Sequence, residues 1–255
     1  TGVRIYYNTP VNEILIEKSE ARGIKTGKEI IKADYVISDA DVFSVYRKLL
    51  PGFQLPKRLK KAELSTSAMV FFWGMKGNFP QLDIHNIFFT ENYKQEFKCL
   101  FRERTISDNP TVYLYISSKI NKTDAPEGCE NWFVMINAPA DYGQDWEKLK
   151  IKARKRILEK LTTLLRKNIE EHIICENFAG PKMIAEQTAS FGGALYGPSS
   201  NSKFSAFYRH PNFSRKIKKL YFVGGTVHPG GGIPLCLASA KIVADEIDEY
   251  EKIQK

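Results

Sequence analysis

Apolar and polar residues alternate along the first part of the chain, and Arg-Gly and Thr-Gly pairs separate the alternating runs. Alternation with a period of two is typical of half-buried strands, and glycine pairs of this kind mark turns. The apolar positions are Val3, Ile5, Tyr7, Val11, Ile14, Ile16, Ile24 and Ile30. The pattern predicts a small antiparallel meander that leads into a buried strand over residues 35–40. Because an isolated meander is not stable in water, we expect it to join a larger sheet.

Longer apolar runs follow, and most of them are rich in Phe, Tyr or Trp. A short helix is expected over residues 42–50, and helical spacing predicts one long helix over residues 146–169. The strands expected in this part cover residues 67–77, 85–89, 111–118, 131–139 and 172–180. The middle of the chain is therefore expected to be of the α+β class, a mostly antiparallel sheet with helices on one side.

Near the end of the chain, residues 218–225 form a continuous apolar run, which is typical of a parallel strand covered on both faces. Three consecutive glycines, 230–232, then precede an amphipathic stretch that starts at Ile233 and Pro234. A tight turn with positive φ needs one or two glycines. A backbone that approaches a ligand at a helix N-terminus accounts for more of them. These residues alone leave both interpretations open.

The two ends of the chain share this α/β pattern, and the middle lies between them as an insertion. We therefore expect an α/β domain built from residues 1–45 and 206–255, and an antiparallel-sheet domain over residues 46–205. No Gly-x-Gly-x-x-Gly sequence opens a βαβ unit in the chain. If a dinucleotide is bound, its main phosphate-binding loop is expected outside these residues.

Composition and charge narrow the classes of partner. The 255 residues carry a formal net charge of +9, with basic clusters at residues 56–61, 148–156 and 215–219. No nucleic-acid motif or aromatic stacking platform accompanies these clusters, so nucleic acid is not predicted as a partner. The second cluster lies on the long helix, where one stripe carries Ile151, Arg154, Leu158, Leu161 and Leu165. A solvated helix with one core face is favoured there over a helix that lies on a membrane.

The spacing of the cysteines and histidines predicts no metal site. The four cysteines form no Cys-x-x-Cys pair, and the four histidines lack the spacing of metal ligands. Reduced, buried thiols are typical of a cytosolic protein. No apolar run is long enough to span a bilayer, and no secretion signal is visible in these residues.

The segment LYFVGGTVHPGGGIPLCLASAKIVADEI resembles the C-terminal part of the bacterial-type phytoene desaturases and related carotenoid desaturases. These are FAD enzymes of the amine-oxidase-like superfamily. Residues 33–51, 85–97, 109–140 and 191–225 agree with the same family in order, so the resemblance covers nearly the whole chain. The details of residues 224–242 look closest to the branch that acts on hydroxylated carotenoids by 3,4-desaturation. His210 departs from the family's pattern, and its role is open.

The resemblance implies the C-terminal part of a two-domain flavoenzyme, with an incomplete FAD-binding α/β domain and an inserted substrate domain. The missing N-terminal half would carry the dinucleotide-binding fingerprint. The implied FAD contacts are Val11 at the adenine, Ala40 on the flavin side, and Gly225, Thr226, Gly231, Gly232 and Ile233 in the turn. Side chains at residues 230–232 would collide with the cofactor, and the helix N-terminus would stabilise reduced, anionic flavin. A plain core valine is an equally good interpretation of Val11.

The implied reaction is the desaturation of a carotenoid, with a hydride passing to flavin N5 and a proton leaving the neighbouring carbon. An apolar, dry tunnel would suffice for much of this chemistry, and no catalytic base is identified. Candidate tunnel residues are Phe71, Phe72, Trp73, Tyr113, Tyr115 and Trp132, although core packing is favoured for each. Candidate residues for a substrate hydroxyl are His85, Asn86, Tyr208 and Arg209.

The resemblance also implies partners and a location. A long-chain polyene lipid is the expected substrate, and an anionic membrane surface is the expected site of loading. We expect a cytoplasmic protein associated peripherally with the inner face of the cell membrane. Two alternatives remain: a related flavin oxidoreductase acting on a retinoid or squalene-like lipid, and an inactive fragment that lacks the dinucleotide-binding half.

Overall fold

The computed structural model describes residues 2–201 and 209–254 of the chain. They fall into two compact units, each discontinuous in sequence. The first unit comprises Thr1–Ser65, Ala189–Phe191 and Tyr196–Lys255, and the second unit comprises Thr66–Thr188 and Gly192–Leu195. The chain therefore leaves the first unit near residue 65 and re-enters it near residue 196, whereas the sequence pattern placed these boundaries at residues 45 and 206.

A three-stranded antiparallel sheet opens the first unit. Its strands β1 (Val11–Glu17), β2 (Glu20–Thr26) and β3 (Ile30–Lys32) pair in the order β1-β2-β3. The alternating residues before β1 form no strand, and Val3 and Tyr7 are 74% and 80% exposed. The predicted meander is thus correct from Val11 onward and wrong before it. Alternation alone does not make a strand where no neighbouring strand supplies hydrogen bonds.

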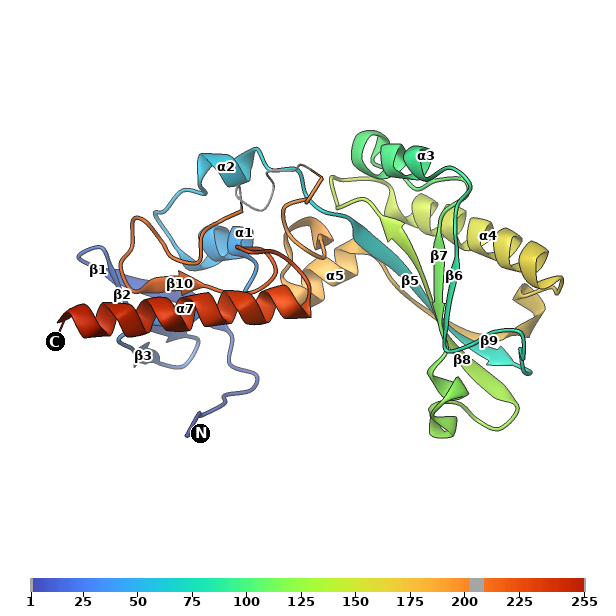
Figure 1. The fold of residues 1–255 in the computed structure, drawn as a ribbon, viewed down its shortest axis with the longest axis horizontal. Helices are drawn as coiled ribbons and strands as arrows, with labels where there is room; N and C mark the ends of the chain where they lie inside the picture. The colour runs from blue at the N-terminus through green and yellow to red at the C-terminus, as the bar shows by residue number, and fades with distance from the viewer. Residues whose placement is uncertain (1, 202–208, 255) are drawn as a thin grey trace. The chain divides into compact units, whose positions relative to one another are not determined.

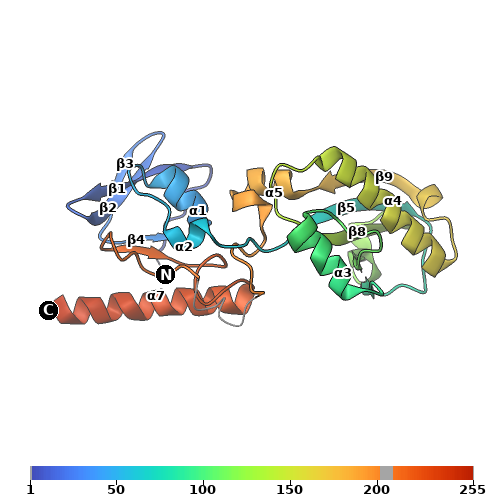
Figure 2. The ribbon, with the colours of Figure 1, turned by 90° about the horizontal axis from the view of Figure 1, so that it is seen from above.

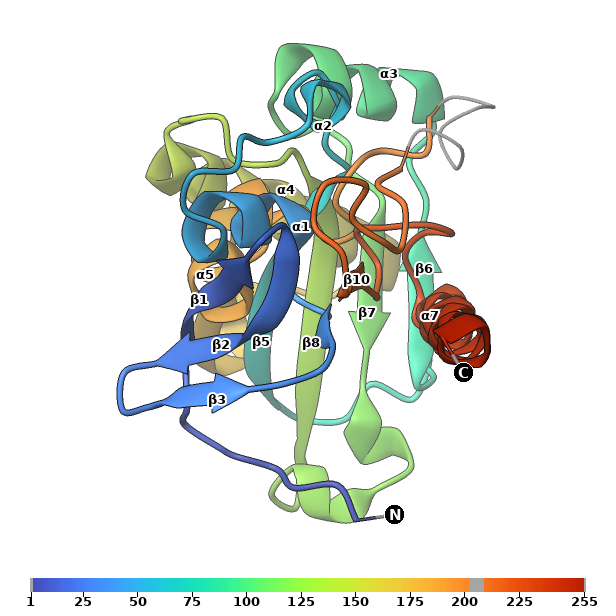
Figure 3. The same cartoon turned by 90° about the vertical axis from the view of Figure 1, so that its left-hand side faces the viewer.

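Two short parallel strands form the centre of the first unit. Strand β4 (Val36–Ser38) pairs with β10 (Leu220–Phe222), with Val36 opposite Leu220. This confirms the prediction of parallel strands drawn from the two ends of the chain. Helix α7 (Ile233–Gln254) runs alongside this pair (Figures 1 and 2). Figure 3 views α7 end-on and shows the β1–β3 sheet and α7 on different sides of β10.

Short helical segments follow β4. Helix α1 (Val42–Ser44) continues into a π-helical turn at Val45–Leu49, and α2 (Lys57–Lys60) comes next. Asp41 caps α1 with its carboxylate, which accepts hydrogen bonds from the N–H groups of Phe43 and Ser44. The helix predicted over residues 42–50 is therefore present, with its second turn widened.

The second unit is built on a five-stranded antiparallel sheet of order β6-β7-β8-β5-β9. The sequence pattern predicted a mostly antiparallel sheet here, but not the order of its strands. Its strands are β5 (Ser67–Lys76), β6 (His85–Phe88), β7 (Val112–Tyr115), β8 (Cys129–Ala138) and β9 (Ile173–Ala179). Its helices are α3 (Tyr93–Lys98), α4 (Trp146–Leu165) and α5 (Pro181–Thr188). Alternate residues of β7 and β8 are buried, because one face of the sheet packs on a helix. In β5 the residues from Ser67 to Phe71 are all buried, and the alternation starts at Phe72.

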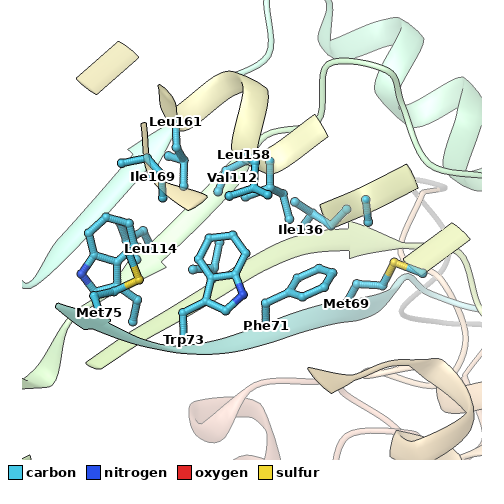
Figure 4. Close-up of a cluster of buried hydrophobic side chains, with 14 of the residues drawn as sticks. Met69, Phe71, Trp73, Met75, Val112, Leu114, Ile136, Leu158, Leu161 and Ile169 are labelled. Carbon is cyan, nitrogen blue, oxygen red and sulfur yellow. The ribbon is translucent and has the colours of Figure 1, made fainter. Parts of the chain in front are cut away.

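The core of the second unit lies between that sheet face and α4 (Figure 4). Phe71 and Trp73 project from β5 toward Leu158 and Leu161 of α4. The buried positions of α4 are Trp146, Ala153, Ile157, Leu158 and Leu161. Ile151 is 69% exposed, so its place on the buried stripe was predicted wrongly. The buried face is instead centred on Ala153 and Ile157, whose side chains are fully buried.

The carboxylate of Glu130, on β8, is nearly fully buried and satisfies three donors in this core. It accepts hydrogen bonds from Phe79 N at 3.0 Å, from Trp132 Nε1 at 2.8 Å and from Lys119 Nζ at 2.6 Å. A buried charge of this kind is tolerated only when it is paired and its lone pairs are occupied. Glu130 therefore fixes the position of the Trp132 ring and of the segment around Phe79.

We predict that Glu130→Ala lowers the free energy of unfolding of the second unit by about 3–5 kcal/mol, because Lys119 and Trp132 lose their common partner. All three tryptophans, Trp73, Trp132 and Trp146, lie in this unit, so their fluorescence during urea unfolding reports on it. Glu127→Ala removes an exposed carboxylate nearby and should change the stability by less than about 0.5 kcal/mol. Equal destabilisation by the two variants would contradict this role of Glu130.

Candidate functional site

The two parallel strands of the first unit end at the same edge. β4 leads into Ala40 and Asp41, and β10 leads into Gly225 and Thr226. Val223 N donates to Ser38 O at 2.9 Å, and Val42 N donates to Thr226 Oγ1 at 3.1 Å. In open α/β sheets, ligands bind outside the carboxyl ends of the strands. This edge brings together Ala40, Gly225 and Thr226, which the sequence analysis singled out separately.

Asp41 is a second anchor at this edge, and the sequence analysis did not select it. Its Oδ1 accepts from Phe43 N at 2.8 Å and from Ser44 N at 3.2 Å, and its Oδ2 accepts from Phe191 N at 3.2 Å. Burial raises the pKa of this carboxyl, and the three N–H donors oppose that effect. The signal was an aspartate directly before an apolar helical run, which is typical of an N-cap.

The glycine-rich turn after β10 needs its glycines for two different reasons. Gly230 and Gly232 have φ values of +146° and +100°, a region that side chains with a Cβ rarely adopt. Gly231 has no such backbone requirement, but a Cβ there would overlap the ring of Tyr196. At Gly232, a Cβ would meet no atom within 4 Å. All three glycines are thus explained within the chain, and Gly232 in addition presents bare backbone to open space.

Helix α7 begins directly at this turn. Gly232 O accepts from Cys236 N at 2.9 Å, which closes the first helical turn. The N–H groups of Ile233 and Leu235 have no partner within the helix, as at any helix start, and they carry the positive end of its dipole. Ile233 is 79% exposed. The turn and the start of α7 therefore form an exposed backbone surface that suits an electron-rich group.

Arg209 has a buried guanidinium that bonds to the backbone beside the turn. Its Nη1 donates to Tyr196 O at 3.0 Å and to Gly225 O at 2.8 Å, and its Nη2 donates to Pro198 O at 2.9 Å and to Ser200 Oγ at 3.2 Å. Burial lowers the pKa of Arg209, which bonds to no carboxylate among the described residues. These bonds use most of its donors, and contact with a substrate hydroxyl stays a prediction.

His210, whose role was open, has a clear structural part. Its Nδ1 lies 2.7 Å from Pro211 O, and since a carbonyl oxygen can only accept, Nδ1 carries the proton. Nε2 then accepts from the Tyr46 hydroxyl at 3.0 Å. Burial lowers the pKa of His210, which favours this neutral form. His210 therefore ties the segment before β10 to the helical turn after β4.

The remaining substrate candidates lie elsewhere. His85 and Asn86 belong to β6 in the second unit, Arg209 belongs to the first unit, and Tyr208 lies outside the described residues. His85 Nδ1 is 2.8 Å from the Tyr113 hydroxyl, on an exposed part of the sheet. Asn86 Nδ2 donates to Asp83 O at 2.7 Å, so that side chain orders the loop before β6. His85 and Asn86 thus belong to a different unit from Arg209, and a shared role for the four residues stays a prediction.

The six aromatic candidates divide between the two faces of the second unit's sheet. Phe71, Trp73 and Trp132 are buried in the core under α4. Phe72, which is 43% exposed, points to the other face, where it contacts Phe133 edge-on at 5.5 Å between ring centroids. The same face carries His85 opposite Tyr115 and Phe133 beside Tyr115 in the strand register. Around Phe72, Tyr115 and Phe133 this face is therefore an aromatic surface with a polar edge at His85, whereas Ala68 and Val70 on the same side of β5 are buried.

Val11 is the first residue of β1, where it pairs with Thr26 and is half-buried. Contact of Val11 with the adenine stays a prediction, as does its alternative role as a core valine. Among the described residues, no group of three or more His, Cys, Asp or Glu side chains could hold a metal ion. In the same part of the chain, no helix combines the length and the apolar character needed to cross a membrane.

We predict that Gly231→Ala destabilises the first unit by about 1–3 kcal/mol, because the new methyl group overlaps Tyr196. In a Tyr196→Gly background the same change should have little effect, since the ring and its Cβ are gone. Hydrogen exchange of the β10 amides measures both steps of this double-mutant cycle. The same loss in both backgrounds would show that Gly231 is required for another reason.

Comparison with known proteins adds a family to this geometry. Residues 1–248 match the family of flavin containing amine oxidoreductases. A 1-hydroxycarotenoid 3,4-desaturase of Flavobacterium sp. (strain P99-3) is 52% identical over 246 residues, which make up 96% of this chain and 50% of that protein. A 4,4'-diaponeurosporene oxygenase of Staphylococcus aureus (strain bovine RF122 / ET3-1) is 36% identical over 98% of this chain and 51% of its own. The chain spans about half the length of the curated relatives it matches.

Solved structures share the fold at low sequence identity. An oxidoreductase from Methanosarcina mazei aligns with 92% of this chain and 49% of its own, with a TM-score of 0.56 and 15% identity. Cyclohexylamine oxidase from Brevibacterium oxydans IH-35A aligns with 94% of this chain and 48% of its own, with a TM-score of 0.54 and 12% identity. The predicted resemblance to carotenoid desaturases is confirmed, and the match over residues 1–248 shows that the chain belongs to the flavin-containing amine oxidoreductase family.

Proposed function

We propose that this chain is the C-terminal part of an FAD-dependent oxidoreductase that desaturates a carotenoid. The observation that carries the proposal is the turn after β10, where Gly232 presents bare backbone to open space at the start of α7. Family membership assigns a flavin cofactor, and the 52% identical relative is a carotenoid desaturase. The 36% identical oxygenase makes oxygen insertion the second candidate, and the difference in identity favours desaturation.

The residues of the turn fit a flavin by their donor chemistry. Gly225, Thr226, Gly231, Gly232 and Ile233 would hold the isoalloxazine and ribityl portions through backbone groups, with the dipole of α7 directed at the electron-rich side. Ala40, at the same strand edge, would lie on the flavin side, and Val11 would contact the adenine. When bound, FAD supplies two-electron oxidation by accepting a hydride at N5.

The chain's own residues would orient these groups rather than exchange protons. Asp41 and Arg209 fix the backbone on either side of the turn through hydrogen bonds to N–H and carbonyl groups. A preorganised backbone lowers the free energy needed to align the reacting atoms. No catalytic base is assigned among these residues.

The aromatic face of the second unit would bind the polyene. Phe72, Tyr113, Tyr115 and Phe133 offer flat apolar surfaces, and His85 offers a polar group at the edge strand. A conjugated chain stacks on such rings without directional bonds. His85 would then receive an end-group hydroxyl, while its bond to Tyr113 orients the imidazole. Asn86, Tyr208 and Arg209 remain further candidates for the same contact.

The proposal includes partners that lie beyond the chain. Relatives of about twice the length support an N-terminal half that completes the FAD site. Leu235 and Leu237 of α7 are 42% and 67% exposed, and they would pack on that half. The polyene substrate would be loaded from an anionic membrane, with the protein on the cytoplasmic face. A chain without the partner half would bind FAD poorly and lack activity.

We predict that Gly232→Val in the full-length protein abolishes flavin incorporation, because a branched side chain at φ +100° both strains the turn and fills the open space. Gly128→Val is the matched control, since Gly128 also has positive φ and nothing within 4 Å of its Cβ. Flavin absorbance per protein after purification measures the effect. Stoichiometric flavin in the Gly232 variant would contradict the backbone contact.

We predict that the full-length protein is reduced at least about tenfold faster by a 1-hydroxycarotenoid than by its deoxy analogue, because a site built to bond a hydroxyl rejects the analogue that lacks it. Flavin bleaching in liposomes under anaerobic conditions gives both rates. His85→Leu should remove most of the difference while leaving the slower rate unchanged. Equal rates for the wild type would exclude hydroxyl recognition and leave general desaturation.

A further inference from the structure

A cavity of about 490 Å³ lies within the first unit, and its lining includes Arg209 and His210, which bond to Gly225 O and His228 N next to the glycine-rich turn. Two segments far apart in sequence line it, residues 46–59 after β4 and residues 209–217 before β10. A hydrogen bond between the Tyr46 hydroxyl and His210 Nε2 joins these two segments. The volume is in the range of pockets that bind small molecules.

The lining of this pocket is largely apolar, and the polar side chains of Tyr46, Arg209 and His210 in it bond within the protein. Leu59 and Ile217 are 3% and 1% exposed, and Phe53 lines the wall half-buried. Phe213 lies at the opening and is 41% exposed. Ser214 uses its hydroxyl to accept from Ile217 N at 3.1 Å, so it offers little to a ligand. A ligand must therefore bring an apolar part into the pocket.

The opening carries positive charge from two clusters that the sequence keeps apart. Lys57 and Arg58 come from residues 56–61, and Arg215 and Lys216 come from residues 215–219. All four side chains are exposed, and no Asp or Glu lines the pocket. Within the described part of the chain, Lys57, Arg215 and Lys216 form no ion pair with a carboxylate. The charges of Lys57, Arg215 and Lys216 at the opening are therefore not neutralised by a carboxylate of the described residues.

The third basic cluster, on α4, behaves differently. Arg154 pairs with Glu170 and Glu176, and Arg156 pairs with Asp108 and Glu159. Lys152 also pairs with Asp108, at 3.2 Å. These cations serve the surface of the second unit itself. Excess positive charge with an adjacent apolar cavity is thus a local property of the pocket, not of every basic cluster.

We propose that this pocket binds an anionic phospholipid of a bilayer, with the phosphate at the basic opening and the start of an acyl chain against Phe213, Leu59 and Ile217. A free phosphate would leave the apolar walls without a partner, whereas a lipid satisfies both parts. The proposal deepens the membrane association proposed above and rests on it, but it does not depend on the flavin site. It assigns membrane contact to one face of the first unit.

Vesicle flotation of the full-length protein tests the proposal, with phosphatidylcholine vesicles that contain or lack phosphatidylglycerol. Lys57→Glu/Lys216→Glu should weaken binding to the anionic vesicles at least about 25-fold, because each near-surface basic side chain contributes about fivefold to affinity. Lys148→Glu/Lys182→Glu changes the net charge equally at exposed positions of the second unit and should shift affinity less than about threefold. Flavin content, measured on each variant, reports separately on the FAD site.

The apolar half of the site is tested by Phe213→Ser against Ile151→Ser, which removes an exposed apolar side chain from α4. Only the Phe213 change should weaken vesicle binding, and inorganic phosphate should not displace the vesicles. Equal losses in both charge-reversal pairs would overturn the proposal in favour of diffuse attraction. Equal wild-type binding to neutral vesicles would also overturn it. The proposal would also be overturned if the protein bound a single-stranded oligonucleotide more tightly than the anionic vesicles, and if Lys57→Glu/Lys216→Glu abolished that binding.

Discussion

The first unit depends on one constraint: two three-residue strands from opposite ends of the chain must lie parallel and end together. Such short strands supply few hydrogen bonds of their own, so side chains complete the arrangement. Thr226 joins the end of β10 to the start of α1, Asp41 joins α1 to Phe191, and Arg209 joins Gly225 to residues 196–200. The glycine-rich turn has a defined shape because these polar side chains are buried with their partners around it.

The second unit is stabilised in a different way. Its strands β5 and β8 pair over ten residues, and a continuous apolar core between the sheet and α4 supplies most of the buried apolar contacts. Carboxylates satisfy the indole N–H groups of that core: Glu130 accepts from Trp132, and Glu176 accepts from Trp73 at 2.7 Å. The α4 core uses one sheet face, and on the other face the side chain of Phe72 is 43% exposed beside Phe133. A rigid sheet with one free aromatic face suits a ligand that is long, flat and apolar.

Much of this architecture could be predicted from the sequence, and the failures have physical causes. The strands of the second unit and the parallel pair follow from runs of apolar residues that only strands or a core can accommodate. The strand predicted from the alternation at Val3–Tyr7 does not form, because the pattern of one segment does not show whether a neighbouring strand is present to pair with it. Asp41 was missed although its place before an apolar helical run is a local N-cap signal. Its bond to Phe191 and the restraint of Gly231 by Tyr196 depend on contacts between segments about 150 and 35 residues apart, which the sequence does not show. The convergence of two basic clusters on one pocket was missed for the same reason.

The central claim is that the turn after β10 and the first turn of α7 form the backbone surface that contacts flavin. Hydrogen–deuterium exchange of the full-length protein, with and without FAD, measures this surface directly. The account predicts slower exchange on FAD addition for the amides of residues 224–226 and 231–235, and no change at the exposed turn around Gly128 of the second unit. Protection confined to other segments, with the amides of Gly232 and Ile233 exchanging at the same rate in both states, would contradict it.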